Sequence, residues 1–183
     1  MLAGAEIRFE KIVPNVDEAA TKEKLRAQSA TPEAIAAALA ELKAVAMSAN
    51  IPGAVVLGSD QILECEGRLF TKAVDMHGAR ETLRALRGKS HRLISAAVLA
   101  RDGAAIWRAT ENAYMTMRSF SEEFLEQYLA VEGEHILGSV GCYRIEAMGV
   151  QLFSEVRGDQ FVVRGMPLLP VLEALRAEGV TKP

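Results

Sequence analysis

The chain has 183 residues, of which half are apolar and a quarter are charged, and its formal net charge is −3. This balance is typical of a soluble globular protein and excludes a disordered or fibrous chain. Its basic residues are scattered, which argues against a nucleic-acid partner. No apolar stretch approaches the roughly 20 residues that cross a bilayer, and "MLAGAEIRFEK" is unlike a signal peptide. We therefore expect a cytoplasmic protein with no membrane partner.

The cysteines and histidines lack the spacing of a metal site. Cys65 and Cys142 form no metal-spaced pair, and His77, His91 and His135 complete no zinc signature. Two buried thiols and three ordinary histidines are the better interpretation.

The N-terminal part of the chain predicts a strand followed by a long helix. Residues 6–14 alternate well enough for a strand, and residues 14–19 form an acidic loop. The helix spans 31–50, with Thr31 as its N-cap, and Lys43 lies next to its apolar stripe.

The middle of the chain predicts a buried strand that ends on an acid. Residues 55–60 open with an apolar run and stop at Gly58-Ser59-Asp60, and two short extended pieces follow within 61–70. Asp75 is placed to cap a helix over 76–87.

The C-terminal half alternates strands and helices. Residues 91–120 predict three strands, the first two joined by a hairpin at Asp102-Gly103. The elements expected after them are a helix over 122–131 capped by Ser121, a glycine-bearing loop over 137–149, a hairpin over 150–165 and a closing helix over 167–179. Interspersed strands, helices and hairpins favour the α/β class, with a mixed sheet flanked by helices in one domain over 1–183.

Asp60 is the strongest single indication of chemistry. Ligands of open α/β sheets bind beyond the carboxyl ends of strands, where a carboxylate can hold Mg²⁺ or take a proton from an attacking water. The alternative, that Asp60 only caps a turn, is equally compatible with the residues.

Two lysines could join Asp60 in a polyphosphate site. Lysine ammonium groups neutralise phosphate oxygens, and a divalent cation held by one or two carboxylates bridges the others. Lys43 and Lys72 are the candidates, and Asp17 or Glu18 could supply the second carboxylate. Taken singly, each lysine is compatible with a solvated surface charge. The glycine-rich phosphate loops and the serine-hydrolase elbow are both missing from the sequence.

A series of blocks, modest singly but specific in order and spacing, runs from about Leu2 to Glu178. The blocks are "FEKIVPNVDE", "LAELKAVA", "VVLGSDQILECEGRLFTK", "LRALRGKSHRLIS", "GSVGCYRIEAMG" and "GDQFVVRGMPLL". Together they resemble the Maf family, or septum formation proteins, which are nucleoside triphosphate pyrophosphatases. The resemblance implies an elongated mixed sheet, two lobes around a nucleotide cleft and a homodimer. It also implies hydrolysis of a nucleoside triphosphate to the monophosphate and pyrophosphate with Mg²⁺ or Mn²⁺.

The resemblance assigns roles to residues that match the family's motifs. Asp60 matches the proton acceptor, Asp17 an acidic position near the metal, and Lys43 and Lys72 the lysines that contact the phosphates. Asp60 would also contribute to metal binding. Preorganised charge of this kind supplies much of the rate in phosphoryl chemistry.

Two further positions bear on the choice of base. The thymidine/uridine subgroup of the family tends to have Thr after the catalytic Asp and Gln in the loop motif, where this chain has Gln61 and Glu146. It thus resembles the subgroup that prefers 7-methyl-GTP. A carboxylate can accept from the N1–H and exocyclic amine of guanine, and it favours the positive charge that N7-methylation adds. The alternative is that Glu146 is a surface residue of a flexible loop.

Family members normally begin with a strand and a turn carrying Ser-x-x-Arg, whereas Met1-Leu2-Ala3-Gly4 aligns with the end of the first helix. A start codon assigned too far downstream, or a short chain of low activity, would account for this.

We expect a Mg²⁺-dependent nucleotide pyrophosphatase that removes non-standard nucleotides. The alternative is a non-catalytic nucleotide-binding or division-associated protein with the same fold.

Overall fold

The computed structural model describes residues 1–182 and contains a five-stranded sheet of order β2-β1-β3-β4-β5. The helices in this part of the chain are all too short or too polar to cross a membrane. The strands are β1 (Val56–Cys65), β2 (Arg68–Phe70), β3 (Ser90–Arg101), β4 (Ala104–Met117) and β5 (Phe153–Arg157). The helices are α1 (Glu18–Ala27), α2 (Pro32–Ser48), α3 (Met76–Leu86), α4 (Glu122–Glu132), α5 (Gln160–Val163) and α6 (Leu168–Ala177), with short 3₁₀ turns η1 (Ala3–Ala5), η2 (Gly133–Gly138) and η3 (Met148–Leu152).

Contacts divide the chain into two compact units. Unit 1 comprises Met1–Gln61, Ile94–Glu111 and the segment from Gln160 onward, and unit 2 comprises Ile62–Leu93 and Asn112–Asp159. The strands β1, β3 and β4 each contribute residues to both units.

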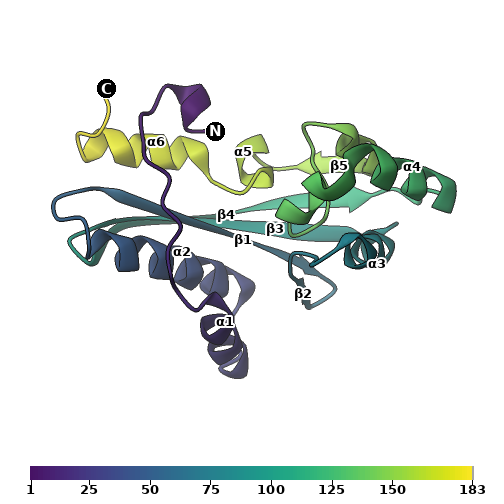
Figure 1. Cartoon of the computed structure of the whole chain (residues 1–183), viewed down its shortest axis with the longest axis horizontal. Coiled ribbons are helices and arrows are strands. Elements are labelled where there is room, and N and C mark those ends of the chain that lie inside the picture. Colours follow the sequence, from purple (N-terminus) through teal and green to yellow (C-terminus); the bar gives the residue numbers. More distant parts are fainter. Residues whose placement is uncertain (183) are drawn as a thin grey trace. The chain divides into compact units, whose positions relative to one another are not determined.

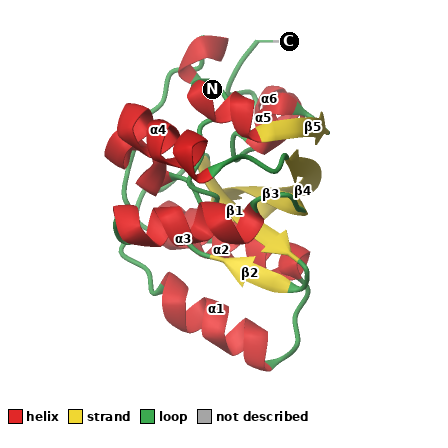
Figure 2. Ribbon diagram, turned by 90° about the vertical axis from the view of Figure 1, so that its right-hand side faces the viewer, coloured by secondary structure: helices red, strands yellow, loops and turns green. Residues whose placement is uncertain are grey.

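In unit 1, helices cover both faces of the strands (Figure 1). On one face, Val171 and Leu175 of α6 pack with Ala97 and Leu99 of β3 in a buried apolar cluster. On the other face lies α2, and α1 lies beyond α2, away from the strands (Figure 2). The Thr31 hydroxyl caps α2 by accepting from the backbone N–H of Ala34, as the sequence predicts.

In unit 2, α3 and α4 carry complementary charges. Arg80 and Arg84 of α3 form ion pairs with Glu126 and Glu122 of α4. Each helix begins with a side-chain cap, from Asp75 for α3 and Ser121 for α4, and both caps were expected from the sequence. Cys65 and Cys142 are buried free thiols, which is the interpretation favoured above.

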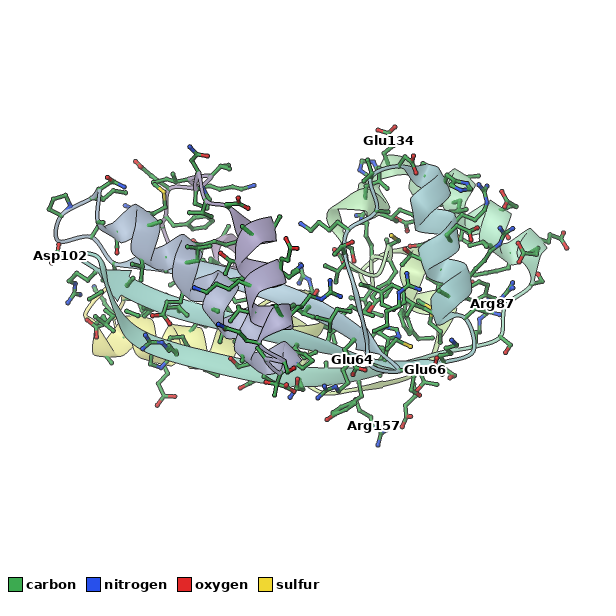
Figure 3. The ribbon with its side chains drawn as sticks, turned by 90° about the horizontal axis from the view of Figure 1, so that it is seen from below. Glu64, Glu66, Arg87, Asp102, Glu134 and Arg157 are labelled. Atoms are coloured by element: carbon green, nitrogen blue, oxygen red, sulfur yellow. The ribbon has the colours of Figure 1, made fainter. Side chains whose placement is uncertain are left out.

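The predicted α/β class, with a sheet flanked by helices, is confirmed, and the sheet is antiparallel. β2 pairs with β1 and β5 with β4 in antiparallel register. β3 and β4 form the predicted hairpin at Asp102-Gly103, whose positive φ angles suit a tight turn, and Figure 3 labels Asp102 there. Between β1 and β3, Ser59 contacts Ala96 while Cys65 contacts Ser90, so the residue numbers run in opposite directions. The sequence predicted a sheet with mixed strand directions, and the structure shows antiparallel pairing.

Three sequence predictions of local structure were wrong. Residues 6–14 form no strand, because no neighbouring strand pairs with them, and Phe9 and Val13 are exposed. Residues 91–120 form two long strands, not three, because β4 continues without a break to Met117. Within 150–165 there is no hairpin, since β5 pairs with β4 and the chain then enters α5.

Candidate active site

Lys43 and Asp60 form a close ion pair in unit 1. The Nζ atom of Lys43 on α2 lies 2.6 Å from Oδ1 of Asp60 on β1. The Lys43 side chain is 19% exposed and that of Asp60 is 13% exposed. Both charges are therefore largely withdrawn from water, where an ion pair is stronger than at the surface.

A glycine in β1 explains how α2 comes this close. A Cβ atom at Gly58 would lie 2.3 Å from the carbonyl oxygen of Ala40 and 2.7 Å from the amide nitrogen of Ala44, both in the α2 backbone. Only glycine leaves room for the helix at this distance.

The prediction that Gly58-Ser59-Asp60 ends the strand was wrong, because β1 continues to Cys65. Asp60 lies in the middle of a strand and faces a helix.

A second carboxylate reaches the same ammonium from α1. Oε2 of Glu18 lies 3.0 Å from Nζ of Lys43. Its neighbour Asp17 is exposed and caps α1, with Oδ1 accepting from the backbone N–H of Ala20 at 2.8 Å. The structure thus brings Glu18 to the Lys43–Asp60 pair, while Asp17 fixes the start of the helix that carries Glu18.

The pair has shifted pKa values. Burial raises the pKa of Asp60 above its ordinary value, and the hydrogen bond and positive charge of Lys43 oppose that rise. Burial alone would lower the pKa of Lys43, but hydrogen bonds and charges from Asp60 and Glu18 outweigh it and raise that pKa. A carboxylate with a raised pKa is a better proton acceptor near neutral pH than an ordinary aspartate.

Gln61 points to the opposite face of the sheet from Asp60, as successive residues of a strand do. Its Nε2 donates to Oγ of Ser95 at 3.0 Å and to the carbonyl of Val162 in α5 at 2.9 Å. On the same face, the Ser59 hydroxyl lies 3.0 Å from the carbonyl of Gly165. Gln61 therefore holds α5 in place. The predicted influence of Gln61 on the choice of base stays a prediction, and it would act through α5.

The oxygens around Lys43 suit a divalent cation shared with a substrate better than a closed metal site. In the residues that the structure describes, no group of three His, Cys, Asp or Glu side chains is arranged to hold a metal. Mg²⁺, however, commonly takes only one or two carboxylates and completes its shell with phosphate oxygens and water. Asp60 and Glu18, which share one ammonium, fit that mode.

Lys72 and Glu146 belong to unit 2. Lys72 is exposed in the loop after β2 and makes no ion pair within residues 1–182. Its predicted contact with the same phosphates as Lys43 stays a prediction. Glu146 is exposed in a turn closed by the hydrogen bond from the Ala147 N–H to the Arg144 carbonyl, at 3.1 Å.

The buried Glu132 is a residue that the sequence reasoning missed. It is the last residue of α4 and is 4% exposed, and its carboxylate bonds to the turn that carries Glu146. The sequence offered little signal for it, because acids are common on exposed helix ends. A glutamate just before a glycine stop, where the helix dipole disfavours it, was the only available hint.

Comparisons with known proteins place the chain in a family. The fold and site define an α/β protein with a half-buried carboxylate–ammonium pair on a strand and a helix. The family model described as "Maf-like protein" matches residues 1–178, and the chain belongs to this family.

Curated relatives carry two names. A "Nucleoside triphosphate pyrophosphatase" of Paramagnetospirillum magneticum is 49% identical over all of this chain and 94% of its own length. A protein of the same name from Caulobacter vibrioides is 48% identical over 98% of this chain and 89% of its own. A "7-methyl-GTP pyrophosphatase" of Mesorhizobium japonicum is 46% identical over 98% of this chain and 90% of its own.

Proposed function

We propose that this protein hydrolyses nucleoside triphosphates to nucleoside monophosphates and pyrophosphate, and so removes non-standard nucleotides. The observation that carries the proposal is the Asp60–Lys43 pair, with 2.6 Å between Oδ1 and Nζ on two regular elements. The names of the relatives from Paramagnetospirillum and Caulobacter support the same activity.

Asp60 is the general base of this reaction. Its carboxylate takes a proton from a water molecule, whose oxygen attacks the phosphorus next to the nucleoside. The bond from that phosphorus to the bridging oxygen breaks, and pyrophosphate leaves with its electron pair. The raised pKa of Asp60 suits proton transfer, and the β1–α2 frame holds the carboxylate in one orientation.

The lysines and the acids of α1 handle the charge of the triphosphate. Lys43 holds Asp60 in place and contributes positive charge to the phosphates, and Lys72 contributes more from its loop. A divalent cation, Mg²⁺ or Mn²⁺, neutralises phosphate oxygens when bound. Asp60 and Asp17 are the proposed ligands, and Glu18 is added because its carboxylate reaches the same ammonium.

The proposed test is pyrophosphate release from a panel of 7-methyl-GTP, GTP, dTTP and UTP, with and without Mg²⁺. Wild-type protein is expected to release pyrophosphate, chelation to abolish release, and Asp60→Ala to be inert. The control is Glu173→Gln, which alters an exposed carboxylate of α6. Full activity of Asp60→Ala would refute the mechanism. Nucleotide binding by calorimetry without any turnover would indicate the non-catalytic alternative.

Glu146 is the proposed reader of the base. Its exposed carboxylate can accept from the N1–H and amine of guanine, and it favours the cationic 7-methyl form. We expect Glu146→Gln to reduce the preference for 7-methyl-GTP over GTP about fivefold, since both bases keep their hydrogen-bond donors but only the cationic one loses an attractive negative charge. The measurement is kcat/KM for both nucleotides. An unchanged ratio would contradict the assignment.

The proposal also includes the setting in which the enzyme works. A nucleotide-cleaning enzyme acts on the cytoplasmic pool, so we propose that this enzyme is cytoplasmic. We also propose the homodimer that the family resemblance implies. Light scattering after size-exclusion chromatography distinguishes a dimer from the 19.8 kDa monomer.

A further inference from the structure

We propose that Glu132 is a positioning residue for base recognition, which holds the 144–148 turn so that Glu146 is presented in one orientation. The inference rests on the proposed function, in which Glu146 reads the base. All the residues concerned belong to unit 2.

The carboxylate of Glu132 binds both ends of the turn. Oε1 accepts from the backbone N–H of Met148 at 2.9 Å, and Oε2 accepts from Nη1 of Arg144 at 3.2 Å. Glu146 lies between these two anchors and is exposed. One carboxylate therefore fixes the residue two positions before Glu146 and the residue two positions after it.

The position of Glu132 is unfavourable for a merely structural role. The residue is 4% exposed, so its charge is removed from water, and it ends α4, where the helix dipole disfavours an anion. An apolar side chain of similar size would fill the same space without either cost. What the carboxylate adds is the pair of bonds to the turn.

Other contacts limit the motion of the turn to its tip. Just before it, the Tyr128 hydroxyl donates to the Cys142 carbonyl at 3.2 Å, and the buried Tyr143 hydroxyl lies 2.8 Å from Nε2 of His91. Just after it, a Cβ atom at Gly149 would lie 2.4 Å from the Arg144 carbonyl oxygen, so the chain is folded tightly back on itself. The backbone beside Glu146 is thus anchored on both sides, and Glu132 supplies the innermost pair of anchors.

A fixed carboxylate reads a base better than a mobile one. A side chain that is already oriented loses less conformational freedom when the base binds, and the gain appears in affinity, not in the chemical step. Loosening the turn should therefore raise KM for a base that Glu146 recognises and leave kcat unchanged.

The test compares Glu132→Gln with Glu134→Gln. Glu134 lies two residues further along in η2 and is exposed, and Figure 3 shows it at the outside of this unit. In Glu132→Gln the amide oxygen can still accept from Met148, but the amide nitrogen then faces Arg144 as a second donor, so that bond is lost. The readout is the ratio of kcat/KM for 7-methyl-GTP to kcat/KM for UTP, whose base lacks the guanine donors. Arg144→Met is a second variant. It removes the bond between Arg144 and Glu132 and leaves the Glu132–Met148 bond intact.

We expect Glu132→Gln to lower the ratio about tenfold through KM, with kcat for both nucleotides within about twofold of wild type. Arg144→Met should act in the same direction, and Glu134→Gln should change nothing. Equal loss of activity towards both nucleotides, or an unchanged ratio, would overturn the inference. If Glu146→Gln shifts the selectivity and Glu132→Gln does not, the inference alone fails. If the wild-type chain releases no pyrophosphate at all, the proposed function fails and this inference with it.

Discussion

Two regions of the molecule hold the carboxylates of the proposed function in different ways. In unit 1, Asp60 is mounted on a strand and faces a helix, and its position follows from the close approach of two backbones at Gly58. In unit 2, Glu146 stands on a turn, which is held by side chains such as Glu132 and Tyr143. The first arrangement suits a general base, which tolerates little displacement, and the second suits a residue that selects among bases. We expect substitutions in the first region to affect catalysis and folding, and those in the second to affect selectivity and pH response.

The largest effect is expected for Lys43→Met. The substitution removes the ammonium that pairs with Asp60, so kcat/KM should fall at least a hundredfold for every triphosphate. It also removes a contact that lowers the pKa of Asp60, so the acid limb of the pH–rate profile should move to higher pH. Lys24→Met, which alters an exposed lysine of α1, is the matched control. If the variant kept near-normal activity and an unchanged acid limb, Lys43 would have no part in catalysis.

Gly58→Ala tests the backbone frame beneath the pair. The added methyl group would overlap the α2 backbone at Ala40 and Ala44, so the free energy of unfolding should fall by about 3 kcal/mol. Urea unfolding monitored by the fluorescence of Trp107, which lies in unit 1, provides the measurement. Gly138→Ala is the control, because a Cβ atom there meets nothing within 4 Å. Equal stability of the two variants would show that α2 can shift away from β1 at little cost.

The smallest effect, and the one confined to unit 2, concerns His91. Burial lowers the pKa of His91 from 6.5 to about 4. The residue is 2% exposed, and its Nδ1 has no hydrogen-bond partner within residues 1–182. The unfolded chain binds a proton below about pH 6.5 and the folded chain does not. The stability that neutral His91 provides is therefore full above pH 6.5 and is lost as the pH falls towards 4, with about 2 kcal/mol of the loss between pH 7 and pH 5.

His91→Gln should flatten this pH dependence, since glutamine can still bond to the Tyr143 hydroxyl but does not titrate in that range. Unfolding free energies at pH 7 and pH 5 measure the slope for wild type and variant. His135→Gln, which alters an exposed histidine in η2, should keep the wild-type slope. If His91→Gln kept the wild-type dependence of stability on pH, other groups would be responsible for it.

The sequence predicted which residues meet at the Asp60 site better than it predicted their surroundings. Residue types and family motifs pointed to Asp60 and Lys43, which the structure brings together. The interpretation of Gly58 as a strand end failed, because a glycine that admits a neighbouring helix and one that ends a strand look alike in one sequence. The contact between Glu18 and Lys43 could not be predicted either, since only the three-dimensional path of α1 brings the two side chains together.

The helices with clear caps were predicted nearly to the residue, because capping is a local property of the chain. Thr31, Asp75 and Ser121 each accept a backbone hydrogen bond where the sequence placed a cap. The strands were predicted less well, because their limits depend on partners distant in sequence. The segment 6–14 has the alternation of a strand but lies beside no other strand, and α1 went unpredicted.

The bonds from β1 to the chain around α5 make the support of the candidate site depend on a distant part of the sequence. Ser59 and Gln61, on either side of Asp60, bond to the carbonyls of Gly165 and Val162, more than 100 positions later. A fragment that stops before residue 160 lacks both partners, so it should leave the segment around Asp60 unsupported on one face.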